Sequence, residues 1–341
     1  MQVAHDNLKL IADKLSSDLE FYRNKRIFVT GGTGFFGKWL LEAFIYFNDR
    51  CNLNASITIL TRSPDRFKSD FPHLFSHYKL NFIQGDVKNF SDIDETFDLI
   101  IHAATDVSSE LNKSNADLMR ETIIDGAKRI CDFAKKVNCK RILYTSSGAA
   151  YGPQPESLTH MPESFMNNPQ FNYDDVYSSA KLESENYFKV SSPCEVVIAR
   201  CFAFSGPYLP LDGNYAFGNF ILDVLNKRNI VINGDGTAVR SYLYSADLVI
   251  WLLKILSLGK NKEIYNVGSP QGISISDLAL LINNLSNNKC ELKISSKKTK
   301  GHNRYVPDVS KARTELGLDI YTSLESSIMQ TLEFNFLART K

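Results

Sequence analysis

The sequence is poor in the features that mark membrane, secreted and metal-binding proteins. No apolar run approaches the ~20 residues that a bilayer-spanning helix needs, and residues 1–25 lack the apolar stretch of a signal peptide. We therefore expect a cytoplasmic protein with reduced thiols, no bound metal and no membrane contact. The cysteines form no CxxC pair and no Cys/His cluster with zinc spacing: Cys51, Cys131, Cys139, Cys194, Cys201 and Cys290.

An excess of positive charge is also missing. Lys and Arg number 39 against 38 Asp and Glu, which gives a formal net charge of +1. Nucleic-acid binders need a clustered positive surface, so nucleic acid is not an expected partner. A local basic pocket for a phosphate-bearing ligand is compatible with this balance. The 341 residues, 43% of them hydrophobic, suit a globular protein of about two domains or one large domain with a cap.

Short apolar runs alternate with longer amphipathic segments through the first two-thirds of the chain. The runs lack strict alternation of polar and apolar residues, which indicates strands buried on both faces of a parallel sheet. Repeated strand-then-helix order predicts an α/β fold with a Rossmann-type doubly wound parallel sheet. The predicted strands are 26–30, 56–60, 81–84, 98–102, 141–145 and 195–199, and the helical segments between them include 38–47, 117–136 and 174–188.

A glycine-rich turn follows the first predicted strand directly. Glycines there permit a tight turn, a close backbone approach to a pyrophosphate and close helix–strand packing, with the N-terminus of the next helix facing the anion. The position after the first core strand, opening a helix, is the context that supports such a fingerprint. We expect dinucleotide binding by Gly31, Thr33, Gly34, Phe35, Phe36 and Gly37.

The ends of the next strands indicate which dinucleotide is bound. An NAD site normally places an acid after the second strand, whereas a nearby Arg accommodates the 2′-phosphate of NADP. Thr61 stands at the acid's position and Arg62 follows it, so NADP(H) is favoured and NAD(H) remains possible. The segment at the end of the third strand is expected to bind the adenine. The fourth strand ends in small residues, which allow the backbone to run close to the cofactor. These cofactor residues are Asp86, Val87, Ala103 and Ala104.

The chain is expected to divide into three parts. Residues 1–25 form a helical extension, because apolar residues recur there at helical spacing and would pack on the core or on a neighbouring subunit. Residues 26–200 form the NAD(P)-binding domain, which also receives segments near 229–268. Residues 201–341 mainly form a smaller mixed α/β C-terminal domain that binds substrate and closes over it. The stripe of the extension is Leu8, Ile11, Leu15, Leu19 and Tyr22, and helices are expected near 216–227, 245–258 and 275–286.

A tyrosine and a lysine four residues apart carry the candidate chemistry. Tyr177 and Lys181 would share one helical face, so that the ammonium can reach both the cofactor ribose and the phenol. The positive charge of Lys181, joined by the oxidised nicotinamide, lowers the pKa of the tyrosine and makes it a usable acid and base. Ser147, at the end of the fifth predicted strand, can bind the same substrate oxygen.

Together these motifs resemble the extended short-chain dehydrogenase/reductase superfamily, in its nucleotide-sugar epimerase/dehydratase branch. The resemblance runs from about residue 25 to about residue 318, through TGGTGFFG, QGDV, HAA, TSSGAAYG, YSSAK, ARCFAFSGP, GDGTAVRSYLY, YNVGS and RYVPDVSKARTELG. It implies a nucleotide-diphosphate sugar as substrate, a homodimer formed through helices that include the one bearing Tyr177, and a role in polysaccharide sugar supply. It also implies that Ser147, Tyr177 and Lys181 are catalytic, and that Asn219, Phe220, Arg240 and Arg304 line the sugar site.

The chain departs from the family pattern at positions that narrow the reaction. Dehydrating members of the family carry an Asp-Glu pair where this chain has Gly148 and Ala149. Neither residue can move a proton, which leaves hydride transfer, at C4 of the sugar, by an epimerase or a 4-ketoreductase. A family Asn is replaced by Ala203. The alternatives are a 4,6-dehydratase-like enzyme and a non-catalytic NAD(P)-binding sensor, the latter opposed by the presence of Tyr177 and Lys181.

Overall fold

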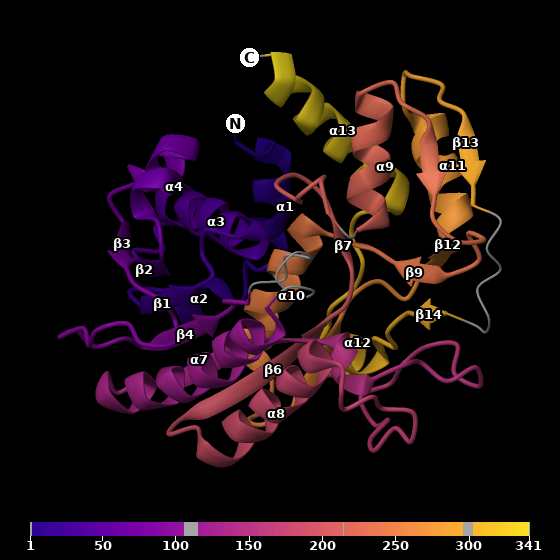
Figure 1. Cartoon of the computed structure of the whole chain (residues 1–341). Helices are drawn as coiled ribbons and strands as arrows, with labels where there is room; N and C mark the ends of the chain where they lie inside the picture. The colour runs from indigo at the N-terminus through magenta and orange to yellow at the C-terminus, as the bar shows by residue number, and fades with distance from the viewer. Residues whose placement is uncertain (1, 106–114, 214, 296–302, 341) are drawn as a thin grey trace.

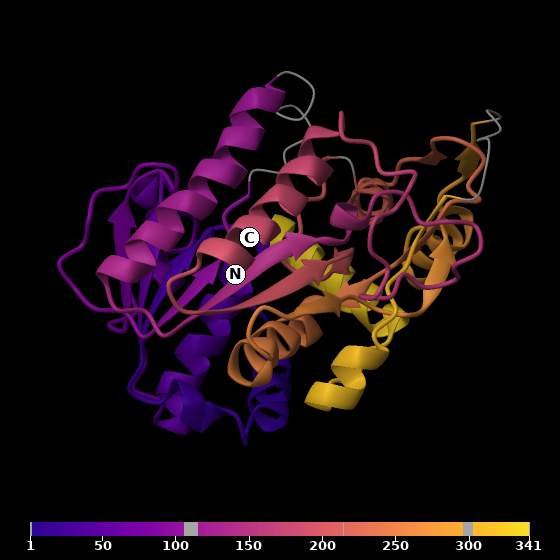
Figure 2. The same cartoon turned by 90° about the horizontal axis from the view of Figure 1, so that it is seen from below.

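The computed structural model describes residues 2–105, 115–213, 215–295 and 303–340. Within these residues, seven parallel strands form one sheet in the order β11-β6-β5-β4-β1-β2-β3 (Figures 1 and 2). This confirms the predicted doubly wound sheet. The strands are β1 (Arg26–Thr30), β2 (Ser56–Thr61), β3 (Leu80–Gln84), β4 (Leu99–His102), β5 (Arg141–Ser147), β6 (Glu195–Cys201) and β11 (Ile264–Val267).

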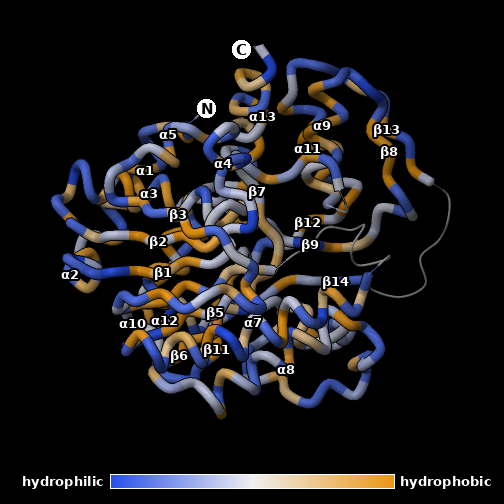
Figure 3. Tube along the Cα trace, turned by 60° about the vertical axis from the view of Figure 1, so that its left-hand side comes forward, coloured by the Kyte–Doolittle hydropathy of each residue, from blue (hydrophilic) through white to orange (hydrophobic). Residues whose placement is uncertain are grey.

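Helices cover both faces of this sheet because successive strand residues point to opposite sides. On β1, Ile27 and Val29 join the apolar cluster under α3 (Phe35–Cys51) and α10 (Ser245–Leu258). Phe28 between them joins the cluster on the other face. That second face is covered by α7 (Ala116–Lys136) and α8 (Val176–Ser191). The hydropathy colouring of Figure 3 follows this layering, with apolar chain concentrated along the strands.

The N-terminal extension is two helices rather than the single one that its stripe suggested. The chain turns between α1 (His5–Lys14) and α2 (Leu19–Tyr22), yet Leu15 in this turn is fully buried. α1 packs on α3 and α10. The amide of Asn7 donates to the Tyr244 hydroxyl over 3.1 Å and to Gln330 over 2.7 Å. The extension is therefore part of the core of this chain.

A smaller region with short strands forms the C-terminal part. Its strands pair as β12-β9-β14, β13-β8 and β10-β7, and its own apolar cluster lies between α9 and α11. This matches the predicted smaller mixed α/β region, whereas the domain boundaries stay a prediction. The elements are β7 (Phe204–Ser205), β8 (Ile230–Ile232), β9 (Val239–Ser241), β10 (Leu243–Tyr244), β12 (Gly272–Ser274), β13 (Leu292–Ile294), β14 (Arg304–Tyr305), α9 (Ala216–Leu225), α11 (Ile275–Leu285), α12 (Ser310–Leu316) and α13 (Leu324–Thr340).

Two shorter helices, α4 (Pro64–Asp70) and α5 (Pro72–Phe75), connect β2 to β3, and a 3₁₀ turn, η1 (Gly148–Tyr151), follows β5. None of the helices in the described part of the chain has the length and apolar content that a membrane crossing requires.

Candidate functional site

The glycine turn between β1 and α3 has the shape that a dinucleotide pyrophosphate needs. Gly31 has φ of +71°, and a Cβ there would lie 2.4 Å from the Ala103 carbonyl oxygen. A Cβ on Gly37 would lie 2.3 Å from the backbone of Gly32. The N-cap of α3 is Gly34, which has no side chain to bond the first helical amides. The backbone can thus approach an anion closely at a helix N-terminus, which fits a bound dinucleotide.

The other predicted residues of this turn flank it. Thr33, Phe35 and Phe36 are half-buried, and the Phe36 ring packs edge-on against Phe204 with centroids 5.0 Å apart. Ala103 and Ala104 follow β4 on the opposite side of the turn. Their backbone amides bond the carbonyl and the hydroxyl of Thr30, both at 3.2 Å. These bonds hold the ends of β1 and β4 together beside the turn.

The residues predicted to read the adenosine end lie after β2 and β3. Thr61 is buried at the end of β2, and Arg62 follows it on the surface. A side-chain oxygen of Asp86 accepts from the Lys88 amide over 3.0 Å and so shapes the turn after β3. Val87 is buried in the cluster under α7. A cofactor contact from Val87 would therefore come from its backbone.

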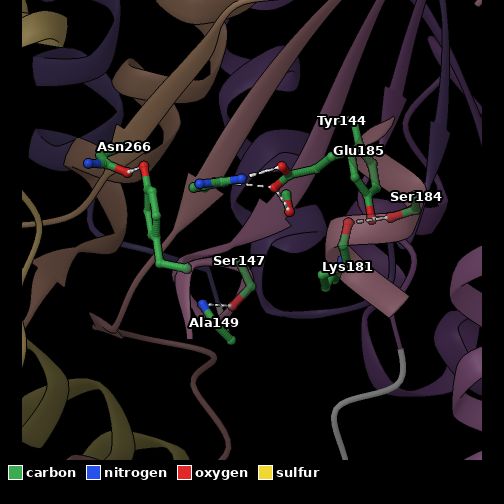
Figure 4. Close-up of polar contacts among 10 residues, drawn as sticks. Tyr144, Ser147, Ala149, Lys181, Ser184, Glu185 and Asn266 are labelled. Atoms are coloured by element: carbon green, nitrogen blue, oxygen red, sulfur yellow. Dashed lines mark hydrogen bonds and ion pairs between the residues drawn. The ribbon is translucent and has the colours of Figure 1, made fainter. Parts of the chain in front are cut away.

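Two adjacent turns of α8 are bonded to three consecutive residues of β5, and Figure 4 shows one of these bonds, between Ser184 and Tyr144. Lys181 donates to the Thr145 carbonyl over 3.0 Å. The next turn of α8 is fixed in the same way, because Ser184 bonds the Tyr144 hydroxyl and Glu185 accepts from the Ser146 hydroxyl. This bonding fixes the height and rotation of α8 beside the strand that ends in the candidate serine.

The pair that holds α8 in place is a buried ion pair. The carboxylate of Glu185 accepts from the Arg200 guanidinium over 2.6 and 2.9 Å, and both side chains are at most 2% exposed. The guanidinium also stacks on Tyr151, 4.0 Å from the ring centroid. Tyr151 in turn donates to Asn266 over 2.8 Å. Figure 4 labels the two ends of this network, Glu185 and Asn266, which lie above Ser147 in the view. Each charge in this network has a partner, as buried charges require.

The structure brings Ser147, Tyr177 and Lys181 together where β5 and α8 meet. The Lys181 ammonium lies 6.0 Å from the Tyr177 ring centroid. Burial raises the pKa of Tyr177 above its usual value. Burial also lowers the pKa of Lys181 to about 8. The ammonium donates to the Thr105 hydroxyl over 2.8 Å as well.

Gly148 and Ala149, which follow Ser147, provide backbone rather than acid. The Ala149 amide donates to the Ser147 hydroxyl over 3.1 Å, so this turn orients the serine. A Cβ on Gly148 would lie 2.7 Å from the hydroxyl oxygen of Tyr305. The place beside Ser147 is thus taken by a phenol from β14. Tyr305 is not among the residues predicted for the site, although it lies next to the predicted Arg304.

The two predicted arginines of the sugar site lie on different faces of the small sheet. In the pairing of β14 with β9, Tyr305 is opposite Arg240 and Arg304 is opposite Val239. Paired residues share a face, and neighbours along a strand point to opposite faces. Arg240 therefore shares the face of Tyr305, and burial lowers the pKa of its guanidinium. Arg304 instead lines a surface pocket with Gln154, Pro155, Glu156, Leu158 and Thr159.

The two residues of α9 that were predicted to contact the sugar, Asn219 and Phe220, also contact other parts of this chain. The amide of Asn219 donates to the Gly213 carbonyl over 2.9 Å, which closes the loop before the helix. Phe220 is 3% exposed inside the apolar cluster of the smaller region. A substrate contact from Phe220 would have to come from its backbone.

The sequence places this site in a known family. Residues 27–268 match the NAD dependent epimerase/dehydratase family, and the chain belongs to that family. UDP-glucuronic acid decarboxylase 6 from Arabidopsis thaliana is 27% identical over 315 residues, which cover 90% of this chain and 88% of that protein. UDP-glucuronic acid decarboxylase 1 from Xenopus tropicalis is also 27% identical over 315 residues, covering 91% of this chain and 72% of that protein.

Solved structures share the fold over nearly the whole chain. The UDP-glucose 4-epimerase of Thermotoga maritima, solved with UDP-glucose, superposes with a TM-score of 0.77 at 21% identity, covering 93% of this chain and all of that one. The dTDP-glucose 4,6-dehydratase of Streptomyces venezuelae, solved with NAD, superposes with a TM-score of 0.79 at 20% identity, covering 92% and 98%. At these identities the likeness shows a common fold.

Proposed function

We propose that this chain transfers a hydride at C4 of a nucleotide-diphosphate sugar, as an epimerase or a 4-ketoreductase, with Tyr177 as the acid and base. The observation that carries the proposal is the assembly of Ser147, Tyr177 and Lys181 beside a turn shaped for a dinucleotide. The nicotinamide, when bound, supplies the hydride acceptor and a positive charge. That charge and the Lys181 ammonium bring the pKa of the buried phenol down toward working pH.

Each side chain then has a defined part in the proton transfer. The Tyr177 oxygen takes the proton of the sugar hydroxyl as the carbon is oxidised and returns it on reduction. The Ser147 hydroxyl bonds the same sugar oxygen and holds it near the phenol. Arg240, on the face shared with Tyr305, would meet the diphosphate with the guanidinium donors that its Nη1 bonds to the Val239 and Asn303 carbonyls leave. Lys181 is held by Thr105 and Thr145 and supplies fixed positive charge.

Gly148 and Ala149 favour this chemistry over a 4,6-dehydratase-like reaction. Loss of water from the sugar needs groups that move protons at carbons beside the ketone. The family places an acidic pair at these two positions, and here they offer a hydrogen atom and a methyl group. Hydride transfer at one carbon needs no such pair.

Decarboxylation of a nucleotide-linked glucuronic acid is the second candidate, favoured by the similarity to UDP-glucuronic acid decarboxylases. Oxidation at C4 of such a sugar makes a β-keto acid. The bond from C5 to the carboxylate can then break, CO₂ leaves, and the electron pair stays as an enolate that is protonated at C5. Return of the hydride to C4 completes the reaction, so Tyr177 and Lys181 would keep their parts.

A substrate panel separates these reactions. We would incubate the protein with NAD⁺ or NADPH and UDP-glucose, UDP-N-acetylglucosamine, UDP-glucuronic acid or dTDP-4-keto-6-deoxyglucose, and follow products by NMR. NADPH loss equal to sugar converted identifies a ketoreductase, isomerised sugar without cofactor loss an epimerase, and CO₂ release a decarboxylase. Tyr177→Phe should reduce any of these rates by about 10²–10⁴-fold. Cofactor binding without turnover identifies a sensor, and no binding of any nucleotide sugar sinks the proposal.

We further propose NADP(H) as the preferred cofactor. The supporting observation is Arg62, exposed directly after the buried Thr61 at the end of β2, where an NAD site has an acid. Arg62→Ala should weaken NADPH binding by about tenfold or more, the effect of one lost charge-assisted hydrogen bond. NADH binding should be unchanged, which makes it the internal control. Equal losses for both cofactors would contradict a contact with the 2′-phosphate.

We also propose a homodimer formed through α8 and its neighbour α7, which pack side by side on one face of the sheet. Sedimentation of the purified chain tests this. A monomer at all protein concentrations would contradict it.

A further inference from the structure

We propose that Thr105 is a positioning residue that holds the ammonium of Lys181 beside Tyr177 and directs its remaining N–H to the cofactor. The inference rests on the proposed function, in which Tyr177 is the acid and base, and adds a residue to it. Its basis is the hydrogen bond from the Lys181 ammonium to the Thr105 hydroxyl, 2.8 Å long, which joins α8 to the segment that follows β4.

Two of the three N–H groups of the ammonium are used within the chain. A lysine ammonium has three donors and no acceptor. One N–H donates to the Thr145 carbonyl over 3.0 Å and a second to the Thr105 hydroxyl. The side chain of Lys181 is 2% exposed, and Glu185, on the next turn of α8, is paired with Arg200 instead. Because the three N–H bonds point to the corners of a tetrahedron, the two acceptors fix the direction of the third.

The Thr105 hydroxyl is oriented to accept this bond. It donates its own proton to the Ala104 carbonyl over 2.8 Å, so its oxygen is left to face the ammonium. The same segment touches the glycine turn, because the Ala104 amide donates to the Thr30 hydroxyl and a Cβ on Gly31 would lie 2.8 Å from the Ala104 nitrogen. Thr105 thus connects the turn shaped for a dinucleotide to the lysine of the candidate catalytic pair.

The aromatic rings around the ammonium cannot replace this bond. The Lys181 nitrogen lies 5.0 Å from the Tyr144 ring centroid and 6.0 Å from that of Tyr177. An aromatic face attracts a cation over a range of positions, whereas a hydrogen bond has a narrow preferred distance and angle. Without the Thr105 hydroxyl, only the Thr145 carbonyl would direct the ammonium, which could then rotate about that single bond.

The bond also favours the charged form of the lysine. Burial lowers the pKa of Lys181 to about 8, whereas the charges of Cys201 on β6 and Glu185 on α8 raise it. His102 on β4 is neutral at this pH, because burial and the Lys181 charge lower its pKa to about 3. An oxygen that accepts from the ammonium stabilises it relative to the neutral amine. Removal of the Thr105 oxygen should therefore lower the pKa of Lys181 further.

The experiment is a pH titration of the full chain without cofactor, observed by NMR of lysine labelled with carbon-13 at Cε. Lys181→Met assigns the resonance. Thr105→Val should lower the pKa of Lys181 by about one unit, the effect of one lost hydrogen bond. Thr105→Ser keeps the oxygen and should restore the wild-type value. The matched control is Thr331→Val, which removes a buried hydroxyl bonded to the Ser327 carbonyl on α13 and should change nothing at Lys181.

Binding of NADPH, followed by its fluorescence, tests the direction of the third N–H. Thr105→Val should weaken this binding by about tenfold, and Thr105→Ser and Thr331→Val should not. An unchanged pKa of Lys181 in Thr105→Val, an equal fall in Thr331→Val, or undiminished NADPH binding by Thr105→Val overturns the proposal. If Thr105→Val does not unfold cooperatively on heating, Thr105→Ala takes its place with the same expected results.

Neither titration needs a sugar, so this proposal and the proposed function fail separately. Both shifts without turnover of any nucleotide sugar would disprove the proposed function and uphold the link between Thr105 and Lys181. Turnover of a nucleotide sugar with neither shift would uphold the proposed function and remove Thr105 from it.

Discussion

The two sides of the candidate site are built in different ways. The side that carries Tyr177 and Lys181 is a long helix bonded turn by turn to a seven-residue strand, over a fully paired buried ion pair. The side that carries Arg240 and Tyr305 is a sheet of strands only two or three residues long. The difference separates two tasks. Proton and hydride transfer need groups held within a fraction of an ångström, whereas the choice of sugar needs a surface that can change.

The test with the largest expected effect removes the buried ion pair on the side of the site that carries Tyr177 and Lys181. Glu185→Ala leaves the Arg200 charge buried without a partner, and should lower the free energy of unfolding by about 3–5 kcal/mol. Glu183, on the same helix, pairs with Arg120 at the surface, where the side chains are 49% and 48% exposed. Glu183→Ala should therefore cost less than about 1 kcal/mol. Urea unfolding measures both, and similar losses would break the comparison.

The next test concerns the side of the site that carries Arg240, and compares Arg240 with its neighbour Arg304. Arg240→Ala should weaken the binding of UDP, used as a probe, by about tenfold or more, since a hydrogen bond to a charged group contributes about 1.5–3 kcal/mol. Arg304→Ala should have a smaller effect, because Arg304 lies on the other face of the sheet. Calorimetric titration distinguishes them. Equal losses would show that Arg304 reaches the ligand, as the sequence predicts.

A third test asks how tightly the glycine turn is packed. Gly37→Ala places a methyl group 2.3 Å from the Gly32 backbone, and overpacking of this kind costs about 1–3 kcal/mol. Gly34→Ala is the control, since its Cβ would meet only the Gly31 oxygen, at 3.3 Å. Thermal unfolding and NADPH titration should both be impaired more in Gly37→Ala. A reversed order would mean that the turn rearranges.

The smallest effect is a pH dependence. Burial lowers the pKa of Lys181 to about 8 from 10.5. The unfolded chain therefore binds more protons than the folded one between these values, and stability rises with pH in that window. Relative to Lys181→Met, which lacks this group, the wild type should gain about 1 kcal/mol between pH 8 and pH 9. Urea unfolding at the two pH values checks the sign of this change. A relative loss of stability from pH 8 to pH 9 would show that the folded state prefers the charged lysine.

Much of the helical side could be predicted because its signals are local. The strands RIFVT and RILYT, the glycine turn and the Tyr177–Lys181 spacing each lie within one element, where periodicity and turn chemistry are readable. The helix boundaries differ by a few residues, as for α3, which begins at Phe35 rather than Lys38. The break between α1 and α2 was missed, since the apolar stripe continues through the turn.

The sugar side could not be predicted in the same way. Tyr305 comes to lie beside Gly148 only through the pairing of β14 with β9, between residues more than sixty positions apart. A two-residue strand has no visible alternation, so nothing local distinguishes the face of Tyr305 from that of Arg304. The ion pair of Glu185 with Arg200 was missed for a related reason. A glutamate on a helix is usually exposed, and the burial of Glu185 depends on a partner, Arg200, that comes from the strand β6.

The bonds of Asn7 to Tyr244 and Gln330 have a consequence for synthesis of the chain. More than three hundred residues separate Asn7 from Gln330, and a ribosome adds about 5–20 residues per second. Asn7 must therefore wait tens of seconds for its partner on α13, and the apolar stripe of α1, which packs on α3 and α10, must wait somewhat less long for α10. During that interval the nascent chain exposes Ile11 and Leu15, residues fully buried in the finished protein. These are the surfaces at which a chaperone would meet it.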